Sequence, residues 1–397
     1  MTEELPRGRP LVSVILAVYN ESRSIETCLT SLLRQDHPDF DLEFLVVDGE
    51  SQDGTRNILD QIAGADKRVR VITNTKKKTP FAFNLGLREA RGEYVCIFGA
   101  HTIYKRNYIA ECFKALREHN AVGSSGRVVT QPLDTGLEAR LVAWIVSHPF
   151  GSSRKSFRTQ AEGYVDHVNY PVMIKQALLE AGGYDEEMTR NQDNDMSQKL
   201  RAKGYKLYCT WKTDCYYFTQ GRLRDLMFYA WRNGFWNFIS LRKNPGAMAA
   251  RHFIPFLFVL GLLGCSLLAG IGAWRAPSHA WSFLFPFIAV LGLHLTVGSI
   301  VALDLARRNK SWAALWLPLG FLGFHVAYGL GTFSALASSA KEVFLRPLRP
   351  AKLKSSSSAI WKRLPGPTRT PEWMPVGTER MTASDRVRRR APLHHEE

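Results

Sequence analysis

The sequence predicts an α/β fold with a mostly parallel sheet and helices on both faces, followed by C-terminal transmembrane helices. Two patterns predict this fold class. In the first hundred residues, short continuous apolar runs alternate with segments of helical spacing. In the last third, three long segments carry no Asp, Glu, Lys or Arg. Strands that are buried on both faces are continuous apolar runs, and their alternation with helices is typical of parallel sheets.

Apolar runs predict four early strands, and segments with apolar residues on one helical face predict the helices between them. In such a sheet the ligand binds at the carboxyl ends of the strands. Between about 120 and 220 the pattern is less regular, with a turn at 182–185, a helix over 192–202 and a strand over 205–211. The early strands are predicted at 11–19, 42–48, 69–73 and 93–98, and the early helices at 21–35, 53–62 and 80–90.

Three uncharged segments predict a transmembrane region of two to three spans. They cover residues 253–274, 281–303 and 311–340, and the first two are long enough to cross a hydrocarbon core of about 30 Å. The loop 304–311 carries three basic residues and the loop 275–280 only one. The positive-inside bias therefore places the N-terminal domain in the cytoplasm, on a multi-pass protein of the inner (plasma) membrane.

The third uncharged segment differs from the other two. Pro318 and four glycines interrupt it, and a very basic tail follows. We therefore expect a re-entrant or interfacial hairpin that leaves the tail on the cytoplasmic side. Before the first span, Phe228, Trp231, Phe235 and Phe238 recur at helical spacing among basic residues. This stripe favours a helix lying in an anionic membrane surface, and a core-packing helix is the alternative.

The chain therefore divides into five parts. They are an N-terminal extension 1–10, an α/β domain 11–220, an amphipathic membrane-interface segment 221–252, the transmembrane region 253–340 and a basic tail 341–397.

The net charge of +16 favours a polyanionic partner. Nearly half of the excess lies in residues 341–397, which hold 13 basic and 6 acidic residues, show no periodicity and are expected to be disordered. No RNA-binding motif accompanies that charge, so anionic membrane lipid or a phosphorylated substrate is expected and nucleic acid is not. Six cysteines without a Cys-x-x-Cys pair argue against a zinc site or a disulfide framework. The first apolar run has the flanks of a strand, not of a signal peptide.

Polar residues at two predicted strand ends are candidates for nucleotide binding. Asp48 could accept the N–H of a pyrimidine base or a ribose hydroxyl, and Tyr19 could stack on the base. The alternative for Asp48 is a turn or helix N-cap residue. Three lysines, ending at Lys78, precede a predicted helix and suit a phosphate there, although such a run is more often a solvated turn.

Two further positions could carry chemistry. His101 follows the fourth strand, where it either touches a pyrophosphate or its metal or is an ordinary loop histidine. Asp193 and Asp195 open a predicted helix and point about 200° apart, so one can face a cleft while the other caps or packs. A lone carboxylate facing a cleft suits a general base for direct displacement at a sugar carbon.

In combination these motifs resemble a known family. The strings VSVILAVYNES, FLVVDGESQDGT, NLGLREARGEY and GGYDEEMTRNQDND occur in that order. They resemble family 2 inverting glycosyltransferases with the GT-A fold, over about residues 10–340. Within that family the chain is similar to membrane-attached transferases of the succinoglycan-biosynthesis type. The closing segment 325–331 falls in the membrane part.

The resemblance implies a role for each matching position. Asp48 would bind uracil or its equivalent, with a UDP-sugar favoured as donor, and Lys78 would meet the phosphates. Asp193, in Gln-Asp where the family usually has Glu-Asp, would be the catalytic base. Asn169, Asp195 and His167 are weaker candidates for contacts with donor or acceptor sugar. The remaining positions of the implied nucleotide-sugar pocket are Ala17, Tyr19, Glu21 and Ala100.

One departure concerns the metal. Such families carry Asp-x-Asp or Asp-x-His after the fourth strand to hold Mg²⁺ or Mn²⁺, whereas here Gly99 replaces the first acid and only His101 remains. A hard cation prefers oxygen ligands. Three outcomes are open: His101 and the pyrophosphate hold the metal, bases such as Lys78 replace it, or the nucleotide-sugar binds weakly or not at all.

The leading hypothesis is a transferase that adds one sugar to a membrane-proximal, lipid-linked or other glycan acceptor in polysaccharide or glycolipid biosynthesis. A processive polysaccharide synthase is an alternative, but that class shows Gln-x-x-Arg-Trp before a larger bundle, and the stretch from Gln220 to Arg232 lacks the motif. A transferase-derived binding or scaffold protein is the third hypothesis, and only Gly99 supports it.

Overall fold

The first four strands form a parallel sheet in the computed structural model, which describes residues 9–188 and 190–345. β1 pairs with β2 on one side and with β4 on the other, and β3 extends the sheet beyond β2. Their apolar runs are buried on both faces. The elements are β1 (Leu11–Val18), α1 (Ile25–Leu33), β2 (Asp41–Asp48), α2 (Thr55–Ala65), β3 (Val69–Thr73), α3 (Thr79–Glu89) and β4 (Tyr94–Gly99).

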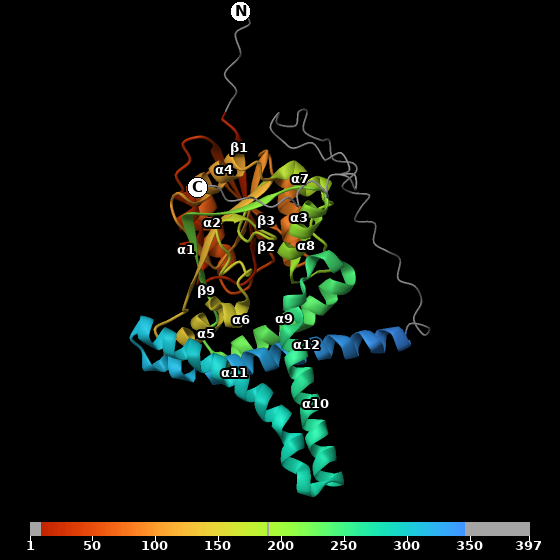
Figure 1. Cartoon of the computed structure of the whole chain (residues 1–397). Helices are drawn as coiled ribbons and strands as arrows, with labels where there is room; N and C mark the ends of the chain where they lie inside the picture. The colour runs from red at the N-terminus through yellow and green to blue at the C-terminus, as the bar shows by residue number, and fades with distance from the viewer. Residues whose placement is uncertain (1–8, 189, 346–397) are drawn as a thin grey trace, which may run out of the picture.

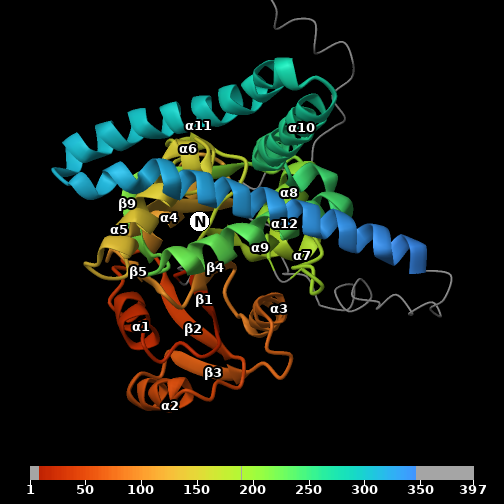
Figure 2. The ribbon, with the colours of Figure 1, turned by 90° about the horizontal axis from the view of Figure 1, so that it is seen from below.

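The direction of the crossovers places the helices on opposite faces of the sheet. The chain moves outward from β1 to β2 and β3, and then returns past both strands to β4. Because such crossovers are right-handed, α1 and α2 cover one face and α3 the other. Figure 2 shows this arrangement. The α/β fold class is thus confirmed, with helices on both faces.

The second half of the sheet mixes strand directions. β8 is antiparallel to β4 and β6, β9 is parallel to β6, and β5 and β7 are antiparallel to β9. The sequence predicts α8 and part of β9 but not the others, most of which are short. The elements are β5 (Thr102–Tyr104), α4 (Tyr108–Glu118), β6 (Gly123–Gln131), α5 (Leu137–Ser147), α6 (Pro149–Ser152), β7 (Gly163–Tyr164), β8 (Val172–Ile174), α7 (Lys175–Glu180), α8 (Gln192–Ala202) and β9 (Leu207–Phe218).

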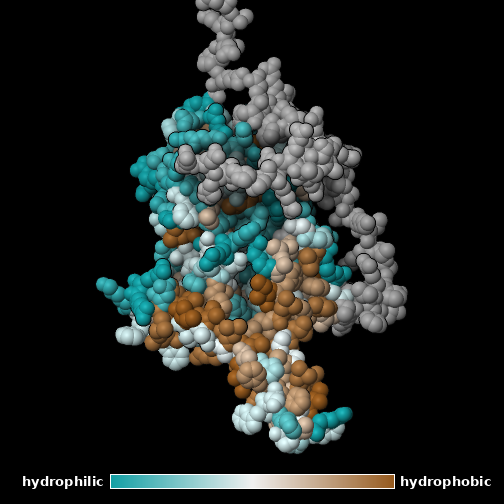
Figure 3. All heavy atoms as spheres, viewed as in Figure 1, coloured by the Kyte–Doolittle hydropathy of each residue, from teal (hydrophilic) through white to brown (hydrophobic). Residues whose placement is uncertain are grey.

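Three long apolar helices follow the α/β domain and α9. The stretches Ala250–Arg275, Pro277–Asn309 and Trp312–Ser339 are each long and apolar enough to cross a membrane. Figure 1 shows α10 and α11 projecting away from the domain, with α12 lying across beneath it. In Figure 3 hydrophobic residues gather on these helices. The four helices are α9 (Leu223–Lys243), α10 (Ile254–Arg275), α11 (Ala280–Asn309) and α12 (Leu317–Leu345), linked by 3-10 turns η1 (Pro245–Ala247), η2 (Ala250–Phe253), η3 (Pro277–His279) and η4 (Trp312–Trp316).

The third uncharged segment is one continuous helix, so the expected hairpin is wrong. Pro318 lies in the first turn of α12, where a missing N–H leaves no helical bond unmade. The glycines mark a close helix contact instead of a break. A Cβ on Gly331 would lie 1.9 Å from the carbonyl oxygen of Trp231, and one on Gly234 equally close to that of Tyr328. Small residues at such crossings let two helix backbones approach each other.

The aromatic segment forms α9, which packs in part as the core interpretation expects, while its place in a membrane surface stays a prediction. One face of the helix is buried, and it includes Gly234 at the contact with α12. On another face Phe228, Trp231 and Phe235 stack in succession, and Phe228 is 59% exposed. The buried face consists of Leu226 and four small or polar residues, while the aromatic row begins with the exposed ring of Phe228.

A second hydrophobic core joins the apolar helices to the α/β domain. It includes Val142 of α5, Leu226 of α9 and Phe321 of α12. The turn η4 packs on α5 as well, so the basic loop between α11 and α12 lies beside the domain. Helices α10 and α11 form an antiparallel pair, and the loop between them lies at the end of this pair that is far from the α/β domain (Figure 1). Residues 1–8 and nearly all of the basic tail lie outside the described residues.

Candidate active site

The register of the parallel strands brings the sequence-predicted nucleotide residues to one edge of the sheet. Val18 pairs with Asp48, and Ala17 pairs with Gly99. The strand order reverses between β1 and β4, and ligands of open α/β sheets bind at such switch points. Ala17, Asp48 and Ala100 therefore meet at the edge where a ligand is expected.

The loops after β1 and β2 are held together by hydrogen bonds. The amide of Asn20 donates to Ser51 Oγ at 2.9 Å, and the amide of Glu21 donates to Thr55 Oγ1 at 2.9 Å. These bonds fix the segment that carries Tyr19, whose ring is 47% exposed. An exposed aromatic ring on a fixed loop is suited to stacking on a base.

Asp48 combines a structural role with a possible binding role. It is only 1% exposed, and Ser51 Oγ donates to its Oδ1 at 2.6 Å. Its Oδ2 lies 3.9 Å from Arg56 Nη1. The carboxylate thus stabilises the turn after β2, as the alternative interpretation expects, and it is also a fixed acceptor at the edge of the sheet.

The lysine turn is tied to the end of β2. The Asn74 amide donates to the backbone oxygen of Asp48 at 2.7 Å, and Asn74 Nδ2 donates to that of Lys78 at 3.1 Å. Lys78 is exposed at the N-cap of α3. A cation and free backbone N–H groups therefore lie at this edge of the sheet, where they suit an anion.

His101 contacts Glu21 across the two strand ends. Its Nδ1 lies 3.4 Å from Glu21 Oε1, and its ring meets the edge of Tyr217 at 5.5 Å. Burial raises the pKa of the Glu21 carboxyl, but hydrogen bonds to His101 and Ser24 outweigh it. The pKa is therefore lower than its ordinary value, and Glu21 is charged at neutral pH.

Asp193 lies in the first turn of α8, on the wall of a cleft of about 1040 Å³. The side chain is half-buried, and Asn169 Nδ2 donates to its Oδ2 at 3.2 Å. Burial raises the pKa of Asp193 to about 6. A carboxylate of that pKa is ionised at neutral pH and basic enough to accept a proton, so the geometry suits a general base.

Helix α9 fixes the turn that carries this carboxylate. Asn191 precedes α8 with a left-handed backbone of φ +61°. Its Nδ2 lies 2.6 Å from Asn237 Oδ1 and 3.1 Å from Ser240 Oγ, both on α9. The orientation of Asp193 is thereby linked to the helix that packs on α12.

Asp195 does not line the cleft, which corrects the expected sugar contact. It is 3% exposed, and Lys199 Nζ lies 2.7 Å from its Oδ2. Asn244 Nδ2 donates to its Oδ1 at 2.8 Å. Two carboxylates two residues apart on a helix point in opposite directions, and Asp195 is the one that packs.

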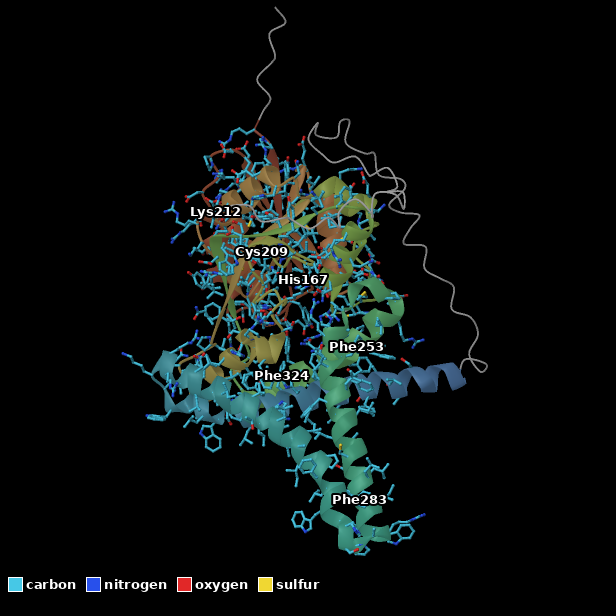
Figure 4. The ribbon with its side chains drawn as sticks, in the orientation of Figure 1. His167, Cys209, Lys212, Phe253, Phe283 and Phe324 are labelled. Carbon is cyan, nitrogen blue, oxygen red and sulfur yellow. The ribbon has the colours of Figure 1, made fainter. Side chains whose placement is uncertain are left out.

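The cleft extends from His101 and Asp193 down to the apolar helices. His167 and Asn169 line its upper part, and Phe324 lines its lower part. Figure 4 shows His167 inside the α/β domain, Phe324 at the level of α12, and Phe283 near the loop that joins α10 and α11. Burial lowers the pKa of His167 to about 4, with Arg251 adding to the effect, so this ring is neutral.

Sequence reasoning missed most residues of this wall. Neither helical nor strand periodicity marks them, because they come from loops and from facing helices. Arg190 and His325 lie in segments that carried the family resemblance, but the resemblance assigned neither a role. The charged and aromatic residues concerned are Arg158, Arg190, Tyr217, Tyr229, Arg232 and Arg251.

The residues at the edge of the sheet do not fit a protein-held divalent cation. Over residues 9–188 and 190–345, no three His, Cys, Asp or Glu side chains gather as ligands. Tyr170 also occupies the space of the missing acid, since a Cβ on Gly99 would lie 3.1 Å from Tyr170 Cε1. Glu21 offers one carboxylate and His101 a ring nitrogen, which is too few ligands for Mg²⁺ or Mn²⁺, since hard cations prefer several oxygens.

Comparison with known proteins agrees with this fold. Residues 13–180 match the sequence model of glycosyl transferase family 2. A succinoglycan biosynthesis protein of Rhizobium meliloti, ExoA, is 26% identical over 77% of this chain and 94% of its own length. A dolichyl N-acetyl-alpha-D-glucosaminyl phosphate 3-beta-D-2,3-diacetamido-2,3-dideoxy-beta-D-glucuronosyltransferase of Methanococcus voltae is 25% identical over 82% of this chain and 97% of its own.

A solved structure supports the fold alone. The mannosyltransferase PcManGT of Pyrobaculum calidifontis, in complex with GDP-Man and Mn²⁺, superposes with a TM-score of 0.51 at 22% identity. The superposition covers 84% of this chain and 89% of that one. Fold, motifs and relatives define a glycosyltransferase of the GT-A type. The chain carries a glycosyltransferase family 2 domain over residues 13–180.

Proposed function

We propose that this enzyme transfers one sugar from a nucleotide-sugar to a membrane-proximal acceptor, with inversion at the anomeric carbon. The observation that carries the proposal is the position of Asp193. It lies in a cleft whose upper end reaches His101 and whose lower end reaches the apolar helices. A single base between a donor site and a membrane-side opening is the arrangement that such a transfer needs.

The donor would bind at the strand ends, which we call the donor edge and define as Ala17, Tyr19, Glu21, Asp48, Lys78 and Ala100. Asp48 would accept from the base or ribose, and Tyr19 would stack on the base. Lys78 and His101 are the candidates to meet the diphosphate. The family resemblance favours UDP, whereas the mannosyltransferase of similar fold carries GDP-Man, so both nucleotides belong in the test.

The chemistry is a single displacement. Asp193 takes the proton of an acceptor hydroxyl as its oxygen attacks the anomeric carbon from the face opposite the diphosphate. The bond from that carbon to the diphosphate breaks, and its electron pair stays on the leaving oxygen. Asn169 holds the carboxylate of Asp193 in place. No step is assigned to a metal, because the described side chains do not form a ligand set for one.

The membrane arrangement is part of the same proposal. We place the domain at the cytoplasmic face of the inner (plasma) membrane, with α10 and α11 inserted and α12 along the interface. The basic loop between α11 and α12 lies beside the domain, as the positive-inside bias requires. The Methanococcus relative is named for a dolichyl phosphate-linked sugar, which supports a lipid-linked acceptor here.

Calorimetry with UDP and GDP on the detergent-purified protein tests the donor edge. Micromolar binding of one nucleotide that is lost in Asp48→Ala supports the proposal. Failure of both nucleotides to bind, with and without Mn²⁺, would contradict it and favour the scaffold hypothesis for the donor edge.

A further inference from the structure

The cleft contains a concentration of positive charge that the displacement reaction does not use. Of the described residues that line it, Asp193 is the one acid, whereas six are basic. The basic residues are Arg154, Lys155, Arg158, Arg190, Arg232 and Arg251. Such an imbalance on the walls of one cleft raises the local concentration of anions.

Arg158 and Arg190 are built into the wall by aromatic and amide contacts. The guanidinium of Arg158 lies 5.0 Å from the ring centre of Tyr217, and that of Arg190 lies 5.1 Å from the ring centre of Tyr229. Arg190 Nη1 also donates to Asn233 Oδ1 at 2.8 Å. These contacts hold two planar donors at fixed positions beside the cleft.

Among residues 9–188 and 190–345, the groups that act on the charges of these two arginines are tyrosines and Arg232, and none is a carboxylate. Arg158 Nε is buried and makes no hydrogen bond. Burial lowers the pKa of Arg190, and the nearby charge of Arg232 adds to that effect. Desolvated cations without a counter-ion are costly, so the site is suited to an anion that comes from outside the chain.

The order of side chains along the cleft indicates what kind of molecule carries that anion. Asp193 lies toward the donor end, and Tyr217 connects Arg158 to His101. Beyond the arginines the lining becomes apolar, with Phe258 of α10 and Phe324 of α12. A matching ligand has a hydroxyl group first, then an anionic group, then a hydrocarbon.

A histidine pair closes the apolar end. His325 Nε2 lies 3.1 Å from the backbone oxygen of Phe150, so it donates there, and its Nδ1 is left to accept. His294 Nε2, at 3.0 Å, then donates to that Nδ1. This chain of bonds connects α6, α12 and α11 and gives the lower cleft a fixed floor.

We propose that Arg158 and Arg190 bind the phosphoryl group of an amphiphilic acceptor whose hydrocarbon tail lies among α10, α11 and α12. The inference rests on the proposed function, because it assigns the acceptor end of the same site. The planar guanidinium groups match phosphate oxygens in pairs. The acceptor sugar attached to that phosphoryl group would reach Asp193.

Binding of farnesyl phosphate to the full-length detergent-purified protein tests the proposal. Wild type should bind it, while Arg158→Gln and Arg190→Gln should each bind at least tenfold more weakly. Arg190→Lys should recover part of the loss. Arg224→Gln, which removes an exposed arginine of α9 outside the cleft, should stay within twofold of wild type. Thermal unfolding of each variant checks that it is folded.

Four further ligands distinguish the sources of the anion. Farnesol should bind more weakly than farnesyl phosphate and respond little to the arginine variants, and inorganic phosphate should not displace the farnesyl compound at equal concentration. UDP and GDP binding should be unchanged by Arg158→Gln. If the arginine variants weaken nucleotide binding and leave farnesyl phosphate binding unchanged, the two arginines bind the donor and the proposal is wrong.

The same data separate this inference from the proposed function. Nucleotide binding without farnesyl phosphate binding by wild type overturns the inference and leaves the transferase proposal standing. If farnesyl phosphate binds in an arginine-dependent way and no nucleotide binds, the inference is supported and the proposed nucleotide site at the donor edge is contradicted.

Discussion

The donor edge comes from segments within the first hundred residues, whereas the lining of the cleft comes from segments between His101 and Tyr328. At the donor edge, three neighbouring parallel strands end together and the loops after two of them are tied to each other. In the cleft, loops of the domain meet α9 and the three apolar helices. Donor binding and acceptor binding therefore depend on separate parts of the molecule, so a variant in one region should leave binding at the other unchanged.

Asp193 lies where the two regions meet, and its loss should have the largest effect. Asp193→Asn should lower kcat about 10³-fold, as expected for removal of a general base, while nucleotide binding stays within threefold of wild type. Single-turnover transfer and calorimetry on the same preparation measure both. Transfer within tenfold of wild type would show that another group takes the proton.

Asp48 tests the donor edge alone. Asp48→Ala should weaken nucleotide binding about 10- to 100-fold, because hydrogen bonds to a charged group contribute about 1.5–3 kcal/mol. Asp60→Ala is the matched control, since Asp60 is 55% exposed on α2 and its ion-pair partner among the described residues is Arg56. Farnesyl phosphate binding should not change in either variant. Loss of both nucleotide binding and farnesyl phosphate binding in Asp48→Ala would indicate that the donor edge and the cleft are not independent.

The pH dependence should report the raised pKa of Asp193. The base is active when ionised, so kcat/KM should fall about tenfold per pH unit below about 6. The folded protein also binds the Asp193 proton more strongly than the unfolded chain does. The stability that this carboxyl contributes is therefore lost as the pH rises through about 6. Asp193→Asn should therefore not lower the melting temperature at neutral pH. A pH profile that is flat down to pH 5 would contradict the assigned pKa.

A variant that disturbs the contact between α9 and α12 should lower stability and weaken acceptor binding more than it weakens donor binding. Gly234→Ala places a Cβ against the backbone of α12 and should destabilise the protein by about 1–3 kcal/mol. Gly264→Ala on α10 is the control, because a Cβ there meets nothing within 4 Å. Thermal unfolding in detergent compares the two, and equal melting temperatures would argue against the close contact.

Gly99→Asp should have the smallest effect. The ring of Tyr170 fills the space that the new side chain needs, so the substitution should not create Mn²⁺-dependent nucleotide binding. Calorimetry with and without Mn²⁺ measures this. Tight binding that appears only with Mn²⁺ would show that the ring moves aside and that one acid is enough.

The donor half of the fold follows closely from the sequence. β3 and α8 occupy their predicted residues, and the other early strands differ from theirs by one residue or so at each end, since continuous apolar runs and short turns leave few alternatives. The strand ends then bring Ala17 and Asp48 together through register alone. Patterns that span a few residues are sufficient for such a site.

The acceptor half could not be predicted in the same way. Arg158 lies in an irregular segment, and only the packing of the domain on α9 brings it near Tyr229. The glycines of α12 predict a break when read alone, but close neighbours explain two of them: Gly331 faces the backbone of α9, and Gly329 faces the backbone of α10 at Pro255. Asp195 resembles Asp193 in sequence, and its contacts with Lys199 and Asn244 decide that it packs.

Transfer of radiolabelled sugar into the lipid fraction of membranes containing the wild-type protein or Asp193→Asn tests the central claim most directly. With the nucleotide-sugar that binds best, wild type should label the lipid fraction in proportion to time, and Asp193→Asn should not do so at equal protein and equal donor binding. Equal labelling by both proteins, or labelled long polymer in place of a single added sugar, would contradict the account.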